Sequence, residues 1–150
     1  VSAVMGLSGL QNYKYGRSVT IPFSERGSLD ETPYRVIEVN KKLGLHTICF
    51  LDIRAQEKRY MTVKGGLQTM LTLEKQKKRR VITTKTLAVG IARAGSTNPT
   101  VKADYVKELI NFEFGGPPHT LVFPGKLHFM EAEALITLAE APESIRGMVK

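Results

Sequence analysis

Apolar and polar positions along the chain follow two different periods, and segments of the two kinds take turns. Nearly continuous apolar runs, typical of strands covered on both faces, occur at residues 46–53 and 86–94, and a β-branched alternating run spans residues 18–23. Apolar residues at helical spacing occupy residues 62–78 and 128–141. This alternation of strands and helices predicts an α/β fold.

Other segments fit the same pattern. A helix with both ends marked precedes the first apolar run, with Thr32 as the expected N-cap, Pro33 at the first helical position and Gly44 just past the end. Residues 101–112 begin extended and end helical, and residues 119–125 form a further strand. The chain opens on small and apolar residues that look like the end of another helix.

The predicted fold class is therefore α/β, a mixed sheet with helices on both faces, in one domain over residues 1–150. A chain of 150 residues can build one substantial core and is too short for two independent ones. The 42% hydrophobic and 24% charged fractions are ordinary for a globular protein. No apolar run approaches the roughly 20 residues of a membrane span, so no membrane partner is expected.

The first residue and the single cysteine add two expectations. The chain begins at Val1 without a signal-peptide pattern, and we interpret it as a fragment or a processed chain. Cys49 has no partner for a disulfide within the chain, which favours a reducing, cytoplasmic compartment. Because Ile48 and Phe50 flank it, Cys49 is expected to be an inert core residue.

Motifs for nucleophilic or metal chemistry are missing from the sequence. There is no GxSxG, HExxH, CxxC or GxxxxGK[ST] pattern. A predicted turn and strand separate His119 from His128, and zinc would need more ligands than one cysteine and such a pair supply. We therefore expect no metal site.

The net charge is +8, and the densest cluster of cations is the run Lys75–Arg80, "KQKKRR". Such a run can bind phosphate backbones or an acidic protein surface, but it also suits the last turn of a helix, where cations complement the helix dipole. No aromatic residue lies among these cations to stack on bases. No direct nucleic-acid partner is expected, and a basic RNA-binding or ribosome-associated module remains the alternative function.

Three segments rich in small residues lie at predicted strand ends: "FLDIRAQ" at 50–56, "ARAGSTNP" at 92–99 and "FGGPPHT" at 114–120. Ligands of α/β sheets bind where strands end and loops open a crevice, and small residues let a ligand approach the main chain. The sequence thus predicts a ligand site formed by these three segments.

Six strings also carry a family resemblance. They are "GLSGLQNYKYGRSVTIPF", "GLHTICFLDI", "RYMT", "LAVGIARAGS", "FGGPPHTLVFPGKLH" and "EAEAL". In this order, and covering nearly the whole chain, they resemble the C-terminal half of the diphthine synthase family, a branch of the tetrapyrrole-methylase-like methyltransferases.

The resemblance implies a two-lobed homodimeric enzyme that binds S-adenosylmethionine between its lobes. It implies N-methylation of a modified histidine on translation elongation factor 2, in diphthamide biosynthesis. The N-terminal lobe of the family, with its glycine-rich "GDP" segment, has no counterpart here, so this chain is expected to be inactive or weak alone.

Carried over by position, the cofactor contacts of the family fall on Val1, Leu51, Ala94 and His119. Val1 corresponds to the second member of a contacting pair. For His119, a main-chain contact is favoured over a role of the ring as general base, and Asp52 is a second candidate to remove a proton. No catalytic residue is assigned.

Two other hypotheses concern the surface. The cations of Lys75–Arg80, or other cationic residues, are candidates to steer elongation factor 2 by long-range attraction. The apolar helix at residues 129–141 suggests, alternatively, a scaffold or dimerisation domain without chemistry.

Overall fold

The computed structural model describes residues 2–24 and 27–149. The helices are α1 (Ser2–Ser8), α2 (Thr32–Lys42), α3 (Val63–Lys77), α4 (Val106–Leu109) and α5 (Phe129–Ala139). The strands are β1 (Val19–Ile21), β2 (Thr47–Leu51), β3 (Ile53–Arg54), β4 (Arg59–Tyr60), β5 (Leu87–Ala92), β6 (Thr100–Tyr105) and β7 (His119–Phe123). No helix in these two ranges is long and apolar enough to cross a membrane.

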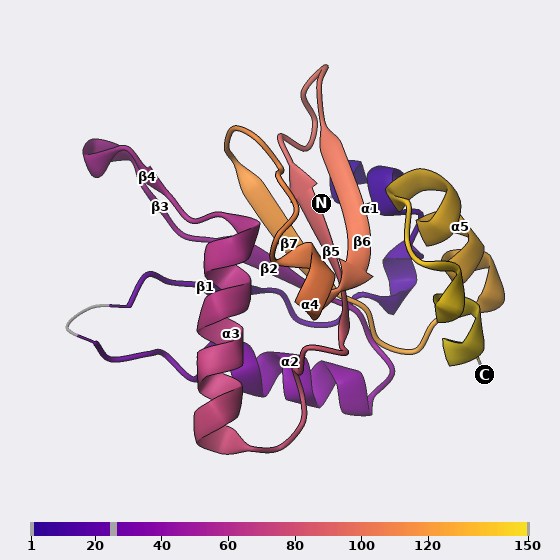
Figure 1. Cartoon of the computed structure of the whole chain (residues 1–150), viewed down its shortest axis with the longest axis horizontal. Coiled ribbons are helices and arrows are strands. Elements are labelled where there is room, and N and C mark those ends of the chain that lie inside the picture. The colour runs from indigo at the N-terminus through magenta and orange to yellow at the C-terminus, as the bar shows by residue number, and fades with distance from the viewer. Residues whose placement is uncertain (1, 25–26, 150) are drawn as a thin grey trace.

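The main sheet has five strands in the order β1-β2-β7-β5-β6. β1 pairs with β2 in parallel, and the pairs β2–β7, β7–β5 and β5–β6 are antiparallel, so the sheet is mixed, as predicted. Helices α2 and α3 lie on one side of the sheet and α1 and α5 on the other (Figure 1). The predicted fold class is confirmed.

Each face of the sheet has its own hydrophobic core. Alternation along β7 sends Leu121 and Phe123 into the core that contains Tyr34 and Leu67 of α2 and α3. Val122, between them, enters the second core, which is built with α1 and α5. Residues on both faces of β7 are fully buried, which explains why the strand lacks the polar alternation of a one-sided sheet.

Several predicted boundaries were wrong by one or more residues. Helix α2 begins at Thr32 and Glu31 is its N-cap residue, so Thr32 is not the cap. Gly44 does follow the helix, and its φ of +75° is the left-handed conformation that ends helices. Strand β2, predicted to run through Ile53, ends at Leu51. Strand β5, predicted to run through Ala94, ends at Ala92.

The 3-10 helices Asn12–Lys14 and Glu143–Met148 were not predicted, and neither was a hairpin. Residues 53–60 form a small hairpin, β3–β4, whose turn is the 3-10 helix Ala55–Glu57 and whose strands are two residues each. Figure 1 shows this hairpin projecting from the body beyond the end of β2. We call residues 53–60 the hairpin arm.

Candidate functional site

The three strand-end segments meet at one edge of the sheet. β2 and β5 both run antiparallel to β7, with Phe50 opposite Thr120 and Ala92 opposite His119. The carboxyl ends of β2 and β5 and the amino end of β7 therefore share an edge, which we call the strand-end edge. Leu51 and His119 lie on it, and Ala94 lies two residues past Ala92. Val1 lies outside the described residues.

The side chains at this edge do not form one cluster. Leu51 is 6% exposed and belongs to the core beneath α2 and α3, whereas the half-buried Ala94 packs against the opposite core. His119 is 8% exposed. What these residues share is their position at or just past the strand-end edge.

Both nitrogens of the His119 ring are used inside the protein. Nδ1 accepts a hydrogen bond from the main-chain N–H of Val63 at 3.1 Å, so it carries no proton. Nε2 lies 2.9 Å from the carbonyl oxygen of Gly115, where a neutral ring donates its proton. The ring thus ties the first turn of α3 to the loop before β7, and it has no free lone pair for a substrate proton.

Arg93 joins the loops on either side of the edge. Its Nη1 donates to the carbonyl oxygens of Phe114 and Gly116 at 3.0 and 2.6 Å. Its Nε and Nη2 donate to the carbonyl oxygen of Asn98 and to Oγ1 of Thr100 at 3.0 and 2.8 Å. Four acceptors on one guanidinium fix the relative positions of the loop after β5 and the "FGG" segment.

The path of that segment depends on small residues. Gly115 has φ of +79°, which favours glycine, and a Cβ there would lie 3.3 Å from Nη1 of Arg93. The ring of Phe114 packs over Gly90 in β5, where a Cβ would meet the ring at 2.3 Å. The glycines therefore let the segment lie against β5 and the Arg93 side chain.

A pocket of about 250 Å³ opens beside His119, between the start of α3 and residues 110–115. Lys64, Asn111 and Glu113 contribute polar side chains to its lining. The strand-end edge thus borders a hollow that can take part of a small ligand.

The carboxylate of Asp52 has a structural role. Its Oδ2 accepts a hydrogen bond from the main-chain N–H of Phe23 at 2.9 Å, and the main chain of Asp52 bonds to Ile21 and Met61. These contacts turn the chain out of β2 and into the hairpin arm. Asp52 is therefore directed toward β1, consistent with the expectation from strand alternation that it points away from Leu51.

The other sequence candidates also have clear positions. Cys49 is fully buried, and burial raises the pKa of its thiol, as expected for an inert core residue. Within the described residues no group of histidine, cysteine and acidic side chains could hold a metal ion.

The basic run lies at the far end of α3. The helix ends at Lys77, which pairs with Glu31, and Arg79 pairs with Glu38 at 3.0 Å. Counting 15 residues at about 1.5 Å each, the run is about 20 Å along α3 from His119. Two of these cations pair with Glu31 and Glu38, and cations at the end of a helix complement its dipole. The position of the run therefore agrees with the alternative explanation, in which it serves the end of the helix.

A buried ionic network was missed by the sequence analysis. Glu131 of α5 is 1% exposed, and its Oε2 lies 2.7 Å from Nε2 of the fully buried His46. The main-chain N–H groups of Gln11 and His128 also donate to this carboxylate, as does the Lys14 ammonium. The network joins α5 to the start of β2. It lies at the opposite end of the strands from the strand-end edge.

The fold matches that of solved structures. The chain superposes on a crystal structure of diphthine synthase with a TM-score of 0.86 and 36% identity, covering 99% of this chain and 54% of that one. It superposes on a candidate diphthine synthase from Entamoeba histolytica with a TM-score of 0.87 and 30% identity, covering 94% and 57%. This chain thus has the fold of an α/β lobe that is found in diphthine synthases.

Sequence relatives agree with the structures. The chain is 52% identical over 149 residues to the diphthine synthase of Methanosarcina acetivorans, covering 96% of this chain and 55% of the relative. It is 48% identical over 142 residues to that of Methanocaldococcus jannaschii, covering 93% and 55%. No protein-family model matches. The chain is a homologue of the diphthine synthases and spans about half the length of the curated relatives it matches.

Proposed function

We propose that this chain forms part of an S-adenosylmethionine-dependent methyltransferase of diphthamide biosynthesis, which N-methylates the modified histidine of translation elongation factor 2. The observation that carries the proposal is the 52% identity to a diphthine synthase over nearly the whole chain. The strand-end edge supports the proposal, because the three segments that carry Leu51, Ala94 and His119 end at the same edge of the sheet.

The edge fits the adenosine portion of S-adenosylmethionine. Buried Leu51 and half-buried Ala94 offer apolar contact, and the small residues of the three segments let a flat base come close to the main chain. Val1 is the fourth proposed contact. When bound, the cofactor supplies a methyl group already activated by its sulfonium.

The residues of this chain then mainly bind and orient. Both ring nitrogens of His119 are hydrogen-bonded, to the main chain of Val63 and of Gly115, so His119 contributes through its main chain and through the shape of the loop. The Asp52 carboxylate likewise accepts a hydrogen bond from Phe23. Alignment of an unprotonated amine and exclusion of water supply much of the rate of such a transfer, so no general base is assigned to this chain.

The rest of the proposal concerns the assembly. The other half of the cleft comes from an N-terminal lobe, the enzyme is a homodimer, and it works in the cytoplasm on a protein substrate. A single lobe offers only one wall of the cofactor site, so residues 1–150 alone have little or no activity.

A chimera tests this function. The 150 residues would replace the matching part of the Methanosarcina acetivorans diphthine synthase, and methyl transfer to elongation factor 2 would be measured with radiolabelled S-adenosylmethionine. Titration with S-adenosylhomocysteine, by calorimetry, would be done on the chimera and on the isolated chain. A folded chimera that neither binds the cofactor product nor transfers methyl groups would refute the proposal, and a salt-dependent RNA complex would support the RNA-binding alternative.

A further inference from the structure

The hairpin arm exposes apolar side chains that add nothing to either core. Ile53 and Tyr60 are directly opposed across β3 and β4, and they are 50% and 42% exposed. A two-stranded hairpin with strands this short is marginally stable by itself. A projecting element that keeps a large apolar pair exposed is typical of a contact surface.

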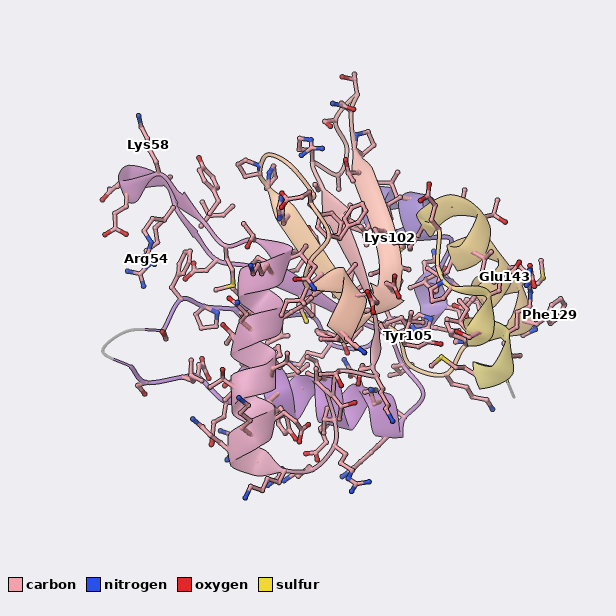
Figure 2. The ribbon with its side chains drawn as sticks, in the orientation of Figure 1. Arg54, Lys58, Lys102, Tyr105, Phe129 and Glu143 are labelled. Atoms are coloured by element: carbon pink, nitrogen blue, oxygen red, sulfur yellow. The ribbon has the colours of Figure 1, made fainter. Side chains whose placement is uncertain are left out.

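The arm is also cationic. Arg54, Lys58 and Arg59 outnumber its one acid, Glu57. The Arg59 guanidinium lies 4.2 Å from the centre of the Phe23 ring and that of Arg54 lies 5.7 Å from it, so stacking on one aromatic ring holds the base of the arm. Lys58, at the turn with φ of 52°, points away from the body (Figure 2).

The hairpin arm lies next to the strand-end edge, so its charges lie beside the proposed cofactor site. β2 ends at Leu51 and β3 begins at Ile53, so a single residue separates the arm from a proposed cofactor contact. The basic run at Lys75–Arg80 is at the other end of α3, next to α2 in Figure 1, about 20 Å along the helix. Of these two cationic clusters, the arm is the one beside the proposed site.

We propose that the hairpin arm docks an acidic surface of the protein substrate, with Lys58 and Arg59 as cationic contacts and the Ile53–Tyr60 pair as the apolar anchor. This inference rests on the proposed function and transfers the steering role from the basic run to the arm. Complementary charge mainly raises the association rate, whereas a desolvated apolar anchor slows dissociation. Binding should therefore weaken as salt concentration rises.

Two matched double variants of the chimera test the proposal. Lys58→Glu with Arg59→Glu reverses two charges on the arm, and Lys75→Glu with Lys78→Glu reverses two charges on the basic run. The backbone is matched at one position of each pair, because Lys58 and Lys78 both have a left-handed conformation, with φ of 52° and 57°. Binding of purified Methanosarcina acetivorans elongation factor 2 is measured by surface plasmon resonance at two salt concentrations, and cofactor binding by titration with S-adenosylhomocysteine.

The arm variant should weaken binding of elongation factor 2 by about tenfold or more, with unchanged affinity for S-adenosylhomocysteine, and the run variant should change it by about twofold or less. Equal effects of both variants, or no binding by the parent chimera, would overturn the docking proposal. So would a loss of cofactor binding or a change in oligomeric mass in the arm variant, because the arm would then pack against other parts of the enzyme.

Two further measurements keep the result interpretable. Lys58→Gly removes one charge and retains the left-handed turn, so it should weaken binding by a smaller factor even if the double variant unfolds the arm. Since binding is measured without methyl transfer, a chimera that binds elongation factor 2 but neither binds S-adenosylhomocysteine nor transfers methyl groups would contradict the proposed function and leave the docking surface standing.

Discussion

Nδ1 of His119 accepts a hydrogen bond from the main-chain N–H of Val63 at 3.1 Å, which ties the start of β7 to the start of α3. Removing the acceptor leaves a buried donor unpaired, so His119→Ala should lower the free energy of unfolding by about 1–3 kcal/mol. His119→Asn should recover most of the loss, because its amide oxygen can replace Nδ1. Urea unfolding of the 150-residue chain measures both.

The same pair of variants separates a positioning role from general-base catalysis. In the active chimera, His119→Asn should keep the shape of the pH–rate profile and most of kcat. If His119→Asn abolished methyl transfer and removed the acid limb of the profile while still binding S-adenosylhomocysteine, the ring would be the base and our assignment would be wrong.

Arg93 should control the order of the loop before β7. In Arg93→Ala the carbonyl groups of Phe114 and Gly116 lose their shared donor. Amide hydrogen exchange at residues 114–116 should become faster, and the chimera should bind S-adenosylhomocysteine about tenfold more weakly, because binding must then order the loop beside the proposed site. Arg17→Ala, on an exposed residue, is the control, and equal losses in both variants would contradict the prediction.

Gly90 should not tolerate a side chain. A Cβ at this position would lie 2.3 Å from the Phe114 ring, so Gly90→Ala must displace the ring and should destabilise the chain by about 1–3 kcal/mol. Gly6→Ala is the matched control, because no atom lies within 4 Å of its added Cβ. Thermal unfolding of the two variants checks this, and a neutral Gly90→Ala would show that the ring can move freely.

The His46–Glu131 pair should make the protein sensitive to acid in two stages. Burial lowers the pKa of His46 below its usual 6.5. Below that pH the unfolded chain therefore binds a proton that the folded protein does not bind, and the free energy of unfolding falls. Burial alone would raise the pKa of Glu131, but hydrogen bonds from Lys14 and from the main chain of Gln11 and His128 hold it at about 2. Its contribution is complete above pH 4.5 and is lost between 4.5 and 2.

Substitution of the carboxylate checks that account. Glu131→Gln should cost about 3 kcal/mol at pH 7, because a buried charge partner is removed, and it should flatten the loss of stability below pH 4.5. Glu133→Gln, also in α5, breaks an exposed pair with Arg146 of the following 3-10 helix; because that pair also lowers the pKa of Glu133, the variant should flatten the acid loss too, but by much less. Urea unfolding at intervals from pH 7 to pH 3 compares the two, and parallel curves would refute the assignment.

The sequence predicted what local patterns determine. Continuous apolar runs indicated strands buried on both faces, and in β2 Ile48 enters one core while Cys49 enters the other. Gly44 marked a helix end because its left-handed φ suits glycine. The strand-end edge was predictable because its three segments all carry small residues at strand ends.

What the sequence could not predict depends on contacts between distant residues. His46 and Glu131 are 85 residues apart, and no pattern pairs a histidine with one acid among many. The role of Arg93 depends on a loop more than 20 residues away, which no local pattern reveals. The hairpin arm escaped detection because strands of two residues are too short to show a period, and the apolar run continued past Leu51 to Ile53.

The place of β7 in the sheet order has a consequence for synthesis on the ribosome. β7 lies between β2 and β5, which have no pairing with each other, yet it is the last strand of the sheet to be translated. Until residues 119–123 leave the exit tunnel, β1–β2 and β5–β6 are two separate pairs, each with an open apolar edge. The sheet is therefore completed late. A nascent chain stalled before His119 exposes the unpaired edges of two strand pairs to chaperones.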